Sequence, residues 1–254
     1  EESDDGTIED QTIKGKIDFK NVYFSYDKEQ LEPTIRDLTF SIDAGESVAL
    51  IGATGAGKTT VMQLLARFYE VDGGEVLIDG TNLTEYKRHN VRSQTAFVLQ
   101  DPYLFESTIR ENIRYGKLDA TDEEVVEAAK LANAHDFIVQ LEDGYDTVLE
   151  LDEGFISQGQ KQLISIARAL ITDPAILLLD EATSSIDTVT ELKIQEALEH
   201  LMKGRTSIII AHRLNTIKAV DRIFVLEQGQ MLESGSEEEL LAKKGRYYEM
   251  INAK

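Results

Sequence analysis

In residues 47–60 the sequence reads SVALIGATGAGKTT, and we expect the fold to be organised around this stretch. Its first part, VALI, is a short apolar run of the kind found in strands that are buried on both faces. The glycine-rich part then turns the chain, and Lys58 begins a segment with the apolar spacing of a helix. Gly52, four further residues, and then Gly57, Lys58 and Thr59 form the pattern of a phosphate-binding loop.

The chemistry of phosphate binding needs these residue types in this order. Glycines let backbone N–H groups converge on phosphate oxygens, and the N-terminus of the following helix adds positive partial charge. We expect Lys58 to reach the β- and γ-phosphates and the Thr59 hydroxyl to bind Mg²⁺. The alternative is an ordinary glycine-rich turn, but the combination of strand, loop, Lys-Thr pair and helix favours phosphate binding.

The composition indicates a globular protein of one domain or two closely packed lobes. The chain has 254 residues, of which 42% are hydrophobic and 29% charged. No apolar run approaches the roughly 18 residues that span a membrane. The absence of cysteine excludes disulfides and thiolate metal sites. A formal net charge of −21 makes duplex nucleic acid a poor partner, and we attribute it to a solvated surface.

Strand-like and helix-like segments follow one another in a definite order. β-Forming residues alternate in residues 16–26 and 34–43, and a short strand between glycines is expected in residues 74–80, which suggests an antiparallel lobe. Residues 108–149 contain no good strand, so a helical lobe is expected there. Strands and helices alternate over residues 47–227, which predicts a mostly parallel sheet with helices on both faces.

The most apolar strand of the chain ends in two carboxylates. Residues 175–180 read AILLLD, and Glu181 follows. Asp180 at the end of a buried strand can hold Mg²⁺, directly or through water, and Glu181 is suited to orient or deprotonate an attacking water. The alternative is an acidic pair that faces solvent, which is common where strands end.

Three helix starts can be seen in the sequence. Thr121 and Ser236 each precede a glutamate by three residues, which is the capping-box pattern. Ser157 begins a third helix in the run SQGQ, where its hydroxyl, the Gly159 amide and free helix N–H groups could form a second anion site. Such a site could bind the nucleotide of another copy of the chain, but a serine in this position is usually only a helix cap.

Taken together, four motifs resemble those of an ATP-binding cassette (ABC) ATPase in their order and spacing. The motifs are GATGAGKTT at 52–60, ISQGQ at 156–160, ILLLDEATSSID at 176–187 and AHR at 211–213. The run LFESTIRENIRYG at 104–116 is similar to the exporter branch of that family. The resemblance covers essentially residues 16–254.

The resemblance implies an α/β fold. It consists of a P-loop NTPase (RecA-like) core with a mostly parallel sheet, an antiparallel β subdomain, and a helical subdomain at about residues 108–171. The ABC ATPase domain is expected to cover residues 13–254. Residues 1–12, which are polar and acidic, are expected to be a disordered linker or tail.

The resemblance also implies roles for single residues. Tyr26 matches the aromatic residue that stacks on adenine, the alternative being a strand aromatic in the core. Gln100 matches the Q-loop glutamine, which contacts Mg²⁺ or the lytic water and senses the transmembrane partner. Glu181 matches the catalytic glutamate, and His212 the switch histidine near the γ-phosphate. Ser185 and Asp187 match the D-loop, and Ser157, Gly159 and Gln160 match the signature motif, which completes the site of the opposite subunit.

These roles define three sets of candidate site residues. The catalytic set is Glu181, His212, Lys58 and Gln100. The nucleotide-binding set is Tyr26, Gly52, Ala53, Thr54, Gly55, Ala56, Gly57, Lys58, Thr59, Thr60, Ser157, Gly159 and Gln160. The Mg²⁺ ligands are Thr59, Gln100 and Asp180.

Two stretches depart from the family pattern. The signature begins with Ile156 instead of leucine and has Gln158 where glycine is commonest, although Ser157 and Gly159 remain. Residues 149–154 do not match the exporter pattern of Gly-Glu, a basic residue and Gly.

The expected function is ATP binding and hydrolysis that powers export of a substrate across a membrane. Two such domains, as a homodimer or heterodimer, would bind MgATP head to tail and act with the transmembrane domains of an exporter, at the cytoplasmic face of the cell membrane. Because no membrane span is visible, we expect an excised domain or a separately encoded subunit that is soluble in isolation. The alternatives are a non-transport ABC ATPase acting on nucleic acid or ribosomes, and an ATP-binding regulatory module without turnover.

Overall fold

The computed structural model describes residues 4–28, 32–149, 156–180, 186–211, 217 and 219–252. Within it the chain forms two compact units. The first consists of Glu1–Thr95, Ala175–Asp180 and Gly204–Lys254, and the second of Ala96–Pro174 and Glu181–Lys203.

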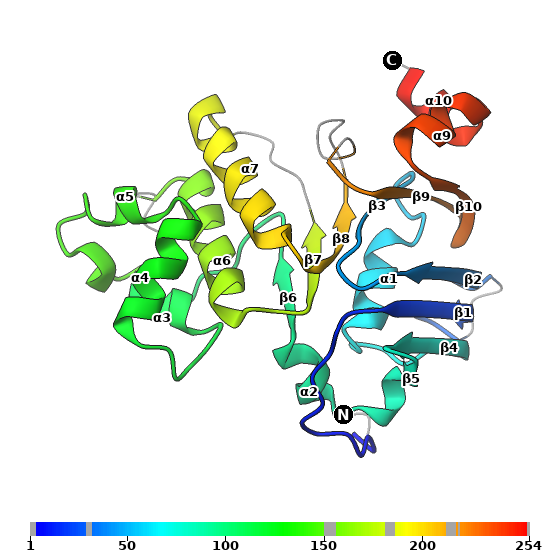
Figure 1. Cartoon of the computed structure of the whole chain (residues 1–254), viewed down its shortest axis with the longest axis horizontal. Helices are drawn as coiled ribbons and strands as arrows, with labels where there is room; N and C mark the ends of the chain where they lie inside the picture. The colour runs from blue at the N-terminus through cyan, green and yellow to red at the C-terminus, as the bar shows by residue number, and fades with distance from the viewer. Residues whose placement is uncertain are drawn as a thin grey trace. The chain divides into compact units, whose positions relative to one another are not determined.

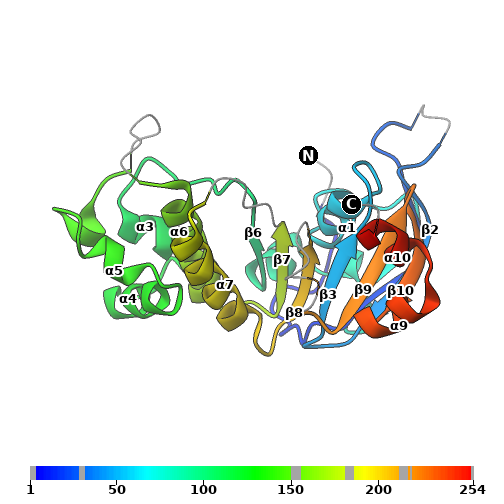
Figure 2. The ribbon, with the colours of Figure 1, turned by 90° about the horizontal axis from the view of Figure 1, so that it is seen from above.

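The first unit is built on a mostly parallel sheet with the glycine-rich loop at the end of one central strand. Its strands lie in the order β10-β9-β3-β8-β7 (Figure 2). β3 runs parallel to β8 and β9, β7 runs parallel to β8, and β10 is antiparallel to β9. The prediction of a mostly parallel sheet is confirmed. The strands are β3 (Ser47–Ile51), β7 (Ile176–Asp180), β8 (Thr206–Ile210), β9 (Arg222–Glu227) and β10 (Gln230–Gly235).

A second, antiparallel sheet in the same unit has the order β2-β1-β4-β5 (Figure 1). Phe19 and Phe40 lie opposite each other in the β1–β2 register, and their rings stack with centroids 4.5 Å apart. Cross-strand aromatic pairs of this kind stabilise a sheet. The prediction of an antiparallel lobe is therefore confirmed. The strands are β1 (Ile17–Phe24), β2 (Ile35–Ile42), β4 (Gly73–Ile78) and β5 (Thr81–Asn82).

Short helices complete the first unit. α1 (Lys58–Leu65) follows the glycine-rich loop, and the 3-10 helix η1 (Leu83–Glu85) leads into α2 (Arg88–Ser93). α9 (Glu237–Lys243) and α10 (Arg246–Asn252) follow β10. They contribute the buried side chains Leu240 and Tyr247 to a cluster that includes residues of β3 and β9.

The second unit is mainly helical. The chain enters it along β6 (Thr95–Val98), and α6 packs against α3, α4 and α7. The sequence led us to expect a helical subdomain at about residues 108–171. The compact helical unit of the structure also contains α7. The predicted domain boundaries, with a linker at residues 1–12, an ATPase domain at 13–254 and a helical subdomain at 108–171, stay predictions. Every helix in the described part of the chain is too short or too polar for a membrane span. The helices are α3 (Ile109–Arg114), α4 (Asp122–Leu131), α5 (His135–Ile138), η2 (Gly144–Asp146), α6 (Gln158–Thr172) and α7 (Thr188–Met202).

The acidic N-terminal segment differs from the disordered linker that we expected. From Asp4 onward it is held against the first unit by backbone hydrogen bonds. The N–H groups of Thr7 and Ile8 donate to the Glu85 carbonyl, at 2.8 and 3.0 Å, and the Lys87 N–H donates to the Ile8 carbonyl, at 2.7 Å. The polar composition of the segment does not reveal these partners, because they lie almost 80 residues further along the chain.

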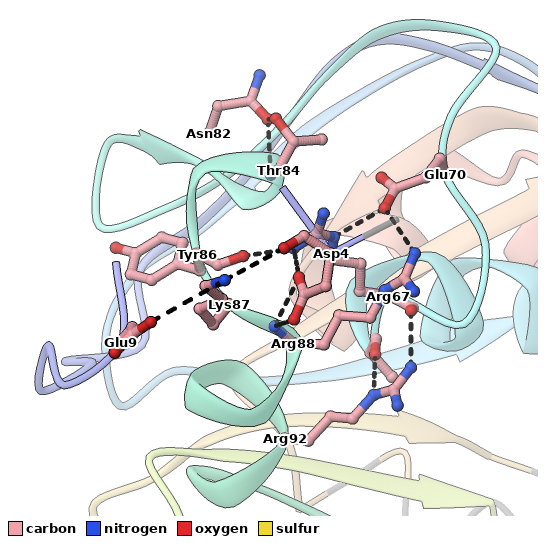
Figure 3. Close-up of polar contacts among 11 residues, drawn as sticks. Asp4, Glu9, Arg67, Glu70, Asn82, Thr84, Tyr86, Lys87, Arg88 and Arg92 are labelled. Atoms are coloured by element: carbon pink, nitrogen blue, oxygen red, sulfur yellow. Dashed lines mark hydrogen bonds and ion pairs between the residues drawn. The ribbon is translucent and has the colours of Figure 1, made fainter. Parts of the chain in front are cut away.

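A buried arginine joins this segment to the end of α1 (Figure 3). Only 3% of the Arg67 side chain is exposed. Its guanidinium donates to the Tyr86 carbonyl, to Glu70 at 2.8 Å and to Asp4 at 3.3 Å. The Arg67 backbone is left-handed, with φ of 56°. The Asp4 carboxylate also accepts from the Arg88 N–H, at the start of α2. Arg67 therefore links α1, α2 and the N-terminal segment.

Candidate nucleotide-binding site

The loop between β3 and α1 needs glycine at specific positions. Gly52, Gly55 and Gly57 have φ values of 153°, 80° and 102°, in a region that side chains other than glycine rarely adopt. A Cβ atom on Gly52 would lie 2.3 Å from the carbonyl oxygen of Leu226, and one on Gly57 would lie 2.7 Å from Cδ1 of Ile35. Around Gly55 there is open space. The first and last glycines are thus fixed by both conformation and packing.

The body of the loop is anchored, whereas its tip is open. The Ala56 N–H donates to the Ala53 carbonyl at 3.1 Å, and the Gly229 N–H donates to the Ala56 carbonyl at 3.1 Å. Ala53, Thr54 and Gly55 are exposed, while Ala56 is buried. An exposed, glycine-rich tip followed directly by a helix N-terminus is the arrangement that binds a phosphate chain.

Lys58 spans the inside of the loop. Its ammonium group donates to the carbonyl oxygens of Gly52, at 2.8 Å, and Ala53, at 3.0 Å. Burial lowers the pKa of Lys58, and the negative charge of Asp180 opposes that lowering. Lys58 and Asp180, which ends β7, thus influence each other electrostatically, while their joint role at a phosphate and metal site stays a prediction.

The donor set at this place fits Mg²⁺. Thr59 is exposed in the first turn of α1, and Asp180 ends the strand β7. A hydroxyl and a carboxylate are hard oxygen ligands, and Mg²⁺ typically uses one or two of these with water and substrate phosphates. The described residues contain no group of three or more histidine, aspartate or glutamate side chains that could hold a metal by themselves. Gln100, the third expected ligand, belongs to the second unit.

Tyr26 lies beside the phosphate loop and is not a core aromatic. It follows β1, and 48% of the residue is exposed. Its hydroxyl is 3.0 Å from the Thr60 hydroxyl in the first turn of α1. The structure therefore brings Tyr26 to the predicted nucleotide site, whereas its stacking on adenine stays a prediction.

In the second unit, Ser157 caps α6. Its hydroxyl accepts a hydrogen bond from the Gln160 N–H at 3.2 Å, and its own N–H donates to Oε1 of Gln160 at 2.9 Å. This reciprocal pair is a capping box. Because the hydroxyl acts as an acceptor here, it retains a proton that it can donate to a ligand oxygen. The capping role and the predicted anion-binding role are compatible.

Gly159 has a packing role that the sequence did not reveal. A Cβ atom there would lie 2.4 Å from Cγ2 of Thr190 and 3.1 Å from Cγ2 of Ile186. Thr190 is in the first turn of α7, which Asp187 caps by accepting the Thr190 N–H at 3.0 Å. That bond lowers the pKa of Asp187. Gly159 therefore lies against Thr190, whose N–H group the predicted D-loop residue Asp187 caps.

The structure also places two glutamines of α6 on either side of the predicted Q-loop residue. The Gln158 amide donates to Asp101 at 3.3 Å, and the buried Gln162 amide donates to the Leu99 carbonyl at 3.3 Å. Gln100 lies between these two contacts in the chain. Gln158, which departs from the family pattern, thus connects the signature helix to the segment around Gln100. No sequence pattern indicated this connection.

Three predicted site residues lie outside the described residues. They are Glu181, Ser185 and His212. Most of the atypical segment 149–154 also lies outside them, and only Leu149 is described.

Fold and loop together define the class of the protein. The central strand of a mostly parallel sheet leads through a glycine-rich loop into a helix. A lysine lies inside this loop and interacts electrostatically with an aspartate. This arrangement defines an α/β P-loop nucleotide-binding fold. The family model described as "ABC transporter" matches residues 35–184. The chain belongs to the ABC transporter family, as the resemblance implied.

Individual relatives agree with this assignment. The chain is 59% identical to an uncharacterized ABC transporter ATP-binding protein of Bacillus subtilis, over 94% of this chain and 39% of that protein. It is 48% identical to an ATP-dependent lipid A-core flippase of Syntrophus aciditrophicus, over 97% of this chain and 40% of that protein. It is also similar to the structure of a bacterial Atm1-family ABC exporter with ATP bound. That match has a TM-score of 0.91 and 40% identity, and it covers 99% of this chain and 44% of that one. The chain thus spans about two fifths of the length of these relatives.

Proposed function

We propose that the chain is the ATP-hydrolysing domain of an exporter. The observation that carries this proposal is the phosphate loop, in which Lys58 lies inside a turn built by glycines and near the carboxylate of Asp180. Relatives named as a lipid A-core flippase and as a fatty acid ATP-binding/permease protein support export as the purpose of hydrolysis.

The catalytic site is composite in this proposal. Two copies of the domain face each other head to tail, so that each nucleotide lies between Lys58 of one copy and Ser157 of the other. Lys58 supplies positive charge to the β- and γ-phosphates, while the Ser157 hydroxyl and the free N–H groups at the start of α6 add donors from the opposite side. In the capping box the Ser157 hydroxyl acts as an acceptor, which is compatible with this donor role.

Hydrolysis follows as an in-line displacement. A water oxygen attacks the γ-phosphorus, its proton passes to Glu181, and the bond between the γ-phosphorus and the bridging oxygen breaks, which leaves ADP and phosphate. His212 contacts the γ-phosphate, and Gln100 orients the attacking water. Mg²⁺ held by Thr59, Asp180 and Gln100 would neutralise charge on the phosphates.

The partners follow from the composite site. They are a second ABC ATPase domain and the transmembrane domains of an exporter, with the ATPase pair at the cytoplasmic face of the membrane. ATP binding would close the pair, and hydrolysis with phosphate release would reopen it. Relatives described as ATP-binding/permease proteins support this arrangement.

The Glu181→Gln variant tests the proposal. With MgATP it should bind nucleotide, lose turnover and elute as a dimer in size-exclusion chromatography, and without nucleotide it should elute as a monomer. Lys58→Ala is the control, because it should lose nucleotide binding and stay monomeric with MgATP. A wild-type chain that binds ATP but shows no turnover at high protein concentration would contradict hydrolysis and favour an ATP-binding module.

A further inference from the structure

The Tyr26 side chain is restrained both by hydrogen bonds at its hydroxyl and by contacts of its ring. Its hydroxyl is hydrogen-bonded to the Thr60 hydroxyl, at 3.0 Å, and to Oε1 of Gln63. Its ring meets the ring of Phe24 edge to face, with centroids 4.9 Å apart and planes at 83°. It meets Tyr69 in the same way, at 5.1 Å and 89°. These contacts leave about half of Tyr26 exposed.

The hydrogen bonds at this hydroxyl have a fixed direction. A phenol has one proton, and the carbonyl oxygen of the Gln63 amide can only accept. Tyr26 therefore donates to Gln63, and the Thr60 hydroxyl donates to Tyr26. The hydrogen bonds therefore run from Thr60 in α1 through Tyr26 to Gln63, which lies one turn further along the same helix.

We propose that Gln63 is a positioning residue for the purine base of ATP, acting through Tyr26. This inference rests on the proposed function, in which Tyr26 stacks on adenine. Gln63 fixes the hydroxyl end of the ring, and Phe24 and Tyr69 fix the ring plane at its sides. The open face of Tyr26 is thus oriented before the base arrives.

The energetic reason is the cost of ordering a side chain on binding. An exposed tyrosine that rotates freely must lose that freedom when a flat base stacks on it, and this weakens binding. A ring that is already fixed does not lose it again. Because Thr60 lies in the first turn of α1, directly after the phosphate loop, the same hydrogen bonds set the position of the base platform relative to the triphosphate.

The Gln63→Leu variant tests the proposal with two probes, ATP and inorganic triphosphate, which lacks a base. Calorimetry should show ATP affinity lowered by about three- to tenfold, the range expected for one newly mobile side chain, with triphosphate affinity unchanged. Gln63→Glu retains an oxygen acceptor at the same position and should bind ATP like the wild type. Tyr26→Phe has no hydroxyl, so adding Gln63→Leu to it should weaken ATP binding no further.

Three outcomes would overturn the role of Gln63. They are unchanged ATP affinity in Gln63→Leu, an equal loss of ATP and triphosphate affinity, and a full additional loss in the Tyr26→Phe background. The second outcome would mean that Gln63 merely supports the helix that follows the loop. Tyr26→Ala separates this failure from that of the proposed function: if it binds ATP as tightly as the wild type, Tyr26 is no adenine platform at all.

Discussion

Arg67 should be one of the most important side chains for the stability of the first unit. The Arg67→Ala substitution removes a side chain that is only 3% exposed and whose guanidinium donates to Tyr86, Glu70 and Asp4 (Figure 3). It leaves the Tyr86 carbonyl and two carboxylates without that donor. Breaking a fully buried ion pair typically costs about 3–5 kcal/mol.

The expected loss of stability is smaller here because two partners of Arg67 are partly exposed. The side chains of Glu70 and Asp4 are 32% and 34% exposed, so water can solvate them after the truncation. We therefore expect a loss of about 2–3 kcal/mol in the free energy of unfolding. Arg67 also has a left-handed backbone, which glycine adopts more easily than alanine. The Arg67→Gly variant should consequently be more stable than Arg67→Ala by about 1 kcal/mol.

Hydrogen exchange of the amides of Ile8 and Lys87 provides a local assay, because both amides donate in the segment that Arg67 secures. Their free energy of opening should fall in both Arg67 variants. Lys130→Ala is the matched control, since it removes an exposed ion pair to Glu127 and should change stability by less than about 0.5 kcal/mol. The reasoning is refuted if Arg67→Ala has the same free energy of unfolding as Lys130→Ala, or if Arg67→Gly is less stable than Arg67→Ala.

Two further predictions concern the phosphate loop and β3. Gly57→Ala combines a φ of 102° with a steric clash, so this variant should lose nucleotide binding and have a lower melting temperature. Gly55→Ala faces open space and should suffer only the smaller strain of its φ of 80°. Thermal unfolding with and without ATP measures both effects. The pKa of Asp221 is lowered chiefly by the hydrogen bond from the Ser47 hydroxyl. The carboxylate therefore stabilises the fold above its unfolded-state pKa and ceases to do so as pH falls through its lower folded-state pKa. The stability difference between wild type and Asp221→Asn should accordingly be present at pH 7 and shrink in urea titrations below about pH 4.

Local signals in the sequence predicted much of the fold and part of the site. The loop of residues 52–60 and Asp180 could be proposed as site residues because a buried strand is followed within a few residues by glycines in one case and by a carboxylate in the other. The capping boxes at Thr121 and Ser236 are confirmed, because a cap and its glutamate are only three residues apart. For the same reason Ser157 was correctly expected to begin a helix.

Contacts between distant parts of the chain could not be predicted in this way. Two of the three partners of Arg67 are a carboxylate 63 residues earlier and a carbonyl 19 residues later. Gly159 is required by Thr190, which approaches it only because α6 and α7 pack together. Composition and periodicity describe which face of a helix is apolar but do not specify which helix covers it. The ordered N-terminal segment was missed for the same reason.

A subunit-mixing experiment tests most directly whether the catalytic site is shared by two chains. Lys58→Ala has an intact Ser157 but a defective loop, and Ser157→Arg has an intact loop but a defective signature helix. Each variant alone should be inactive as an ATPase, and Ser157→Arg should still bind ATP, which shows that it is folded. An equal mixture at high concentration should recover between about a quarter and about a half of the wild-type rate per chain, because each mixed dimer has one intact site of two. Full activity of Ser157→Arg alone, or no recovery on mixing, would contradict the composite site.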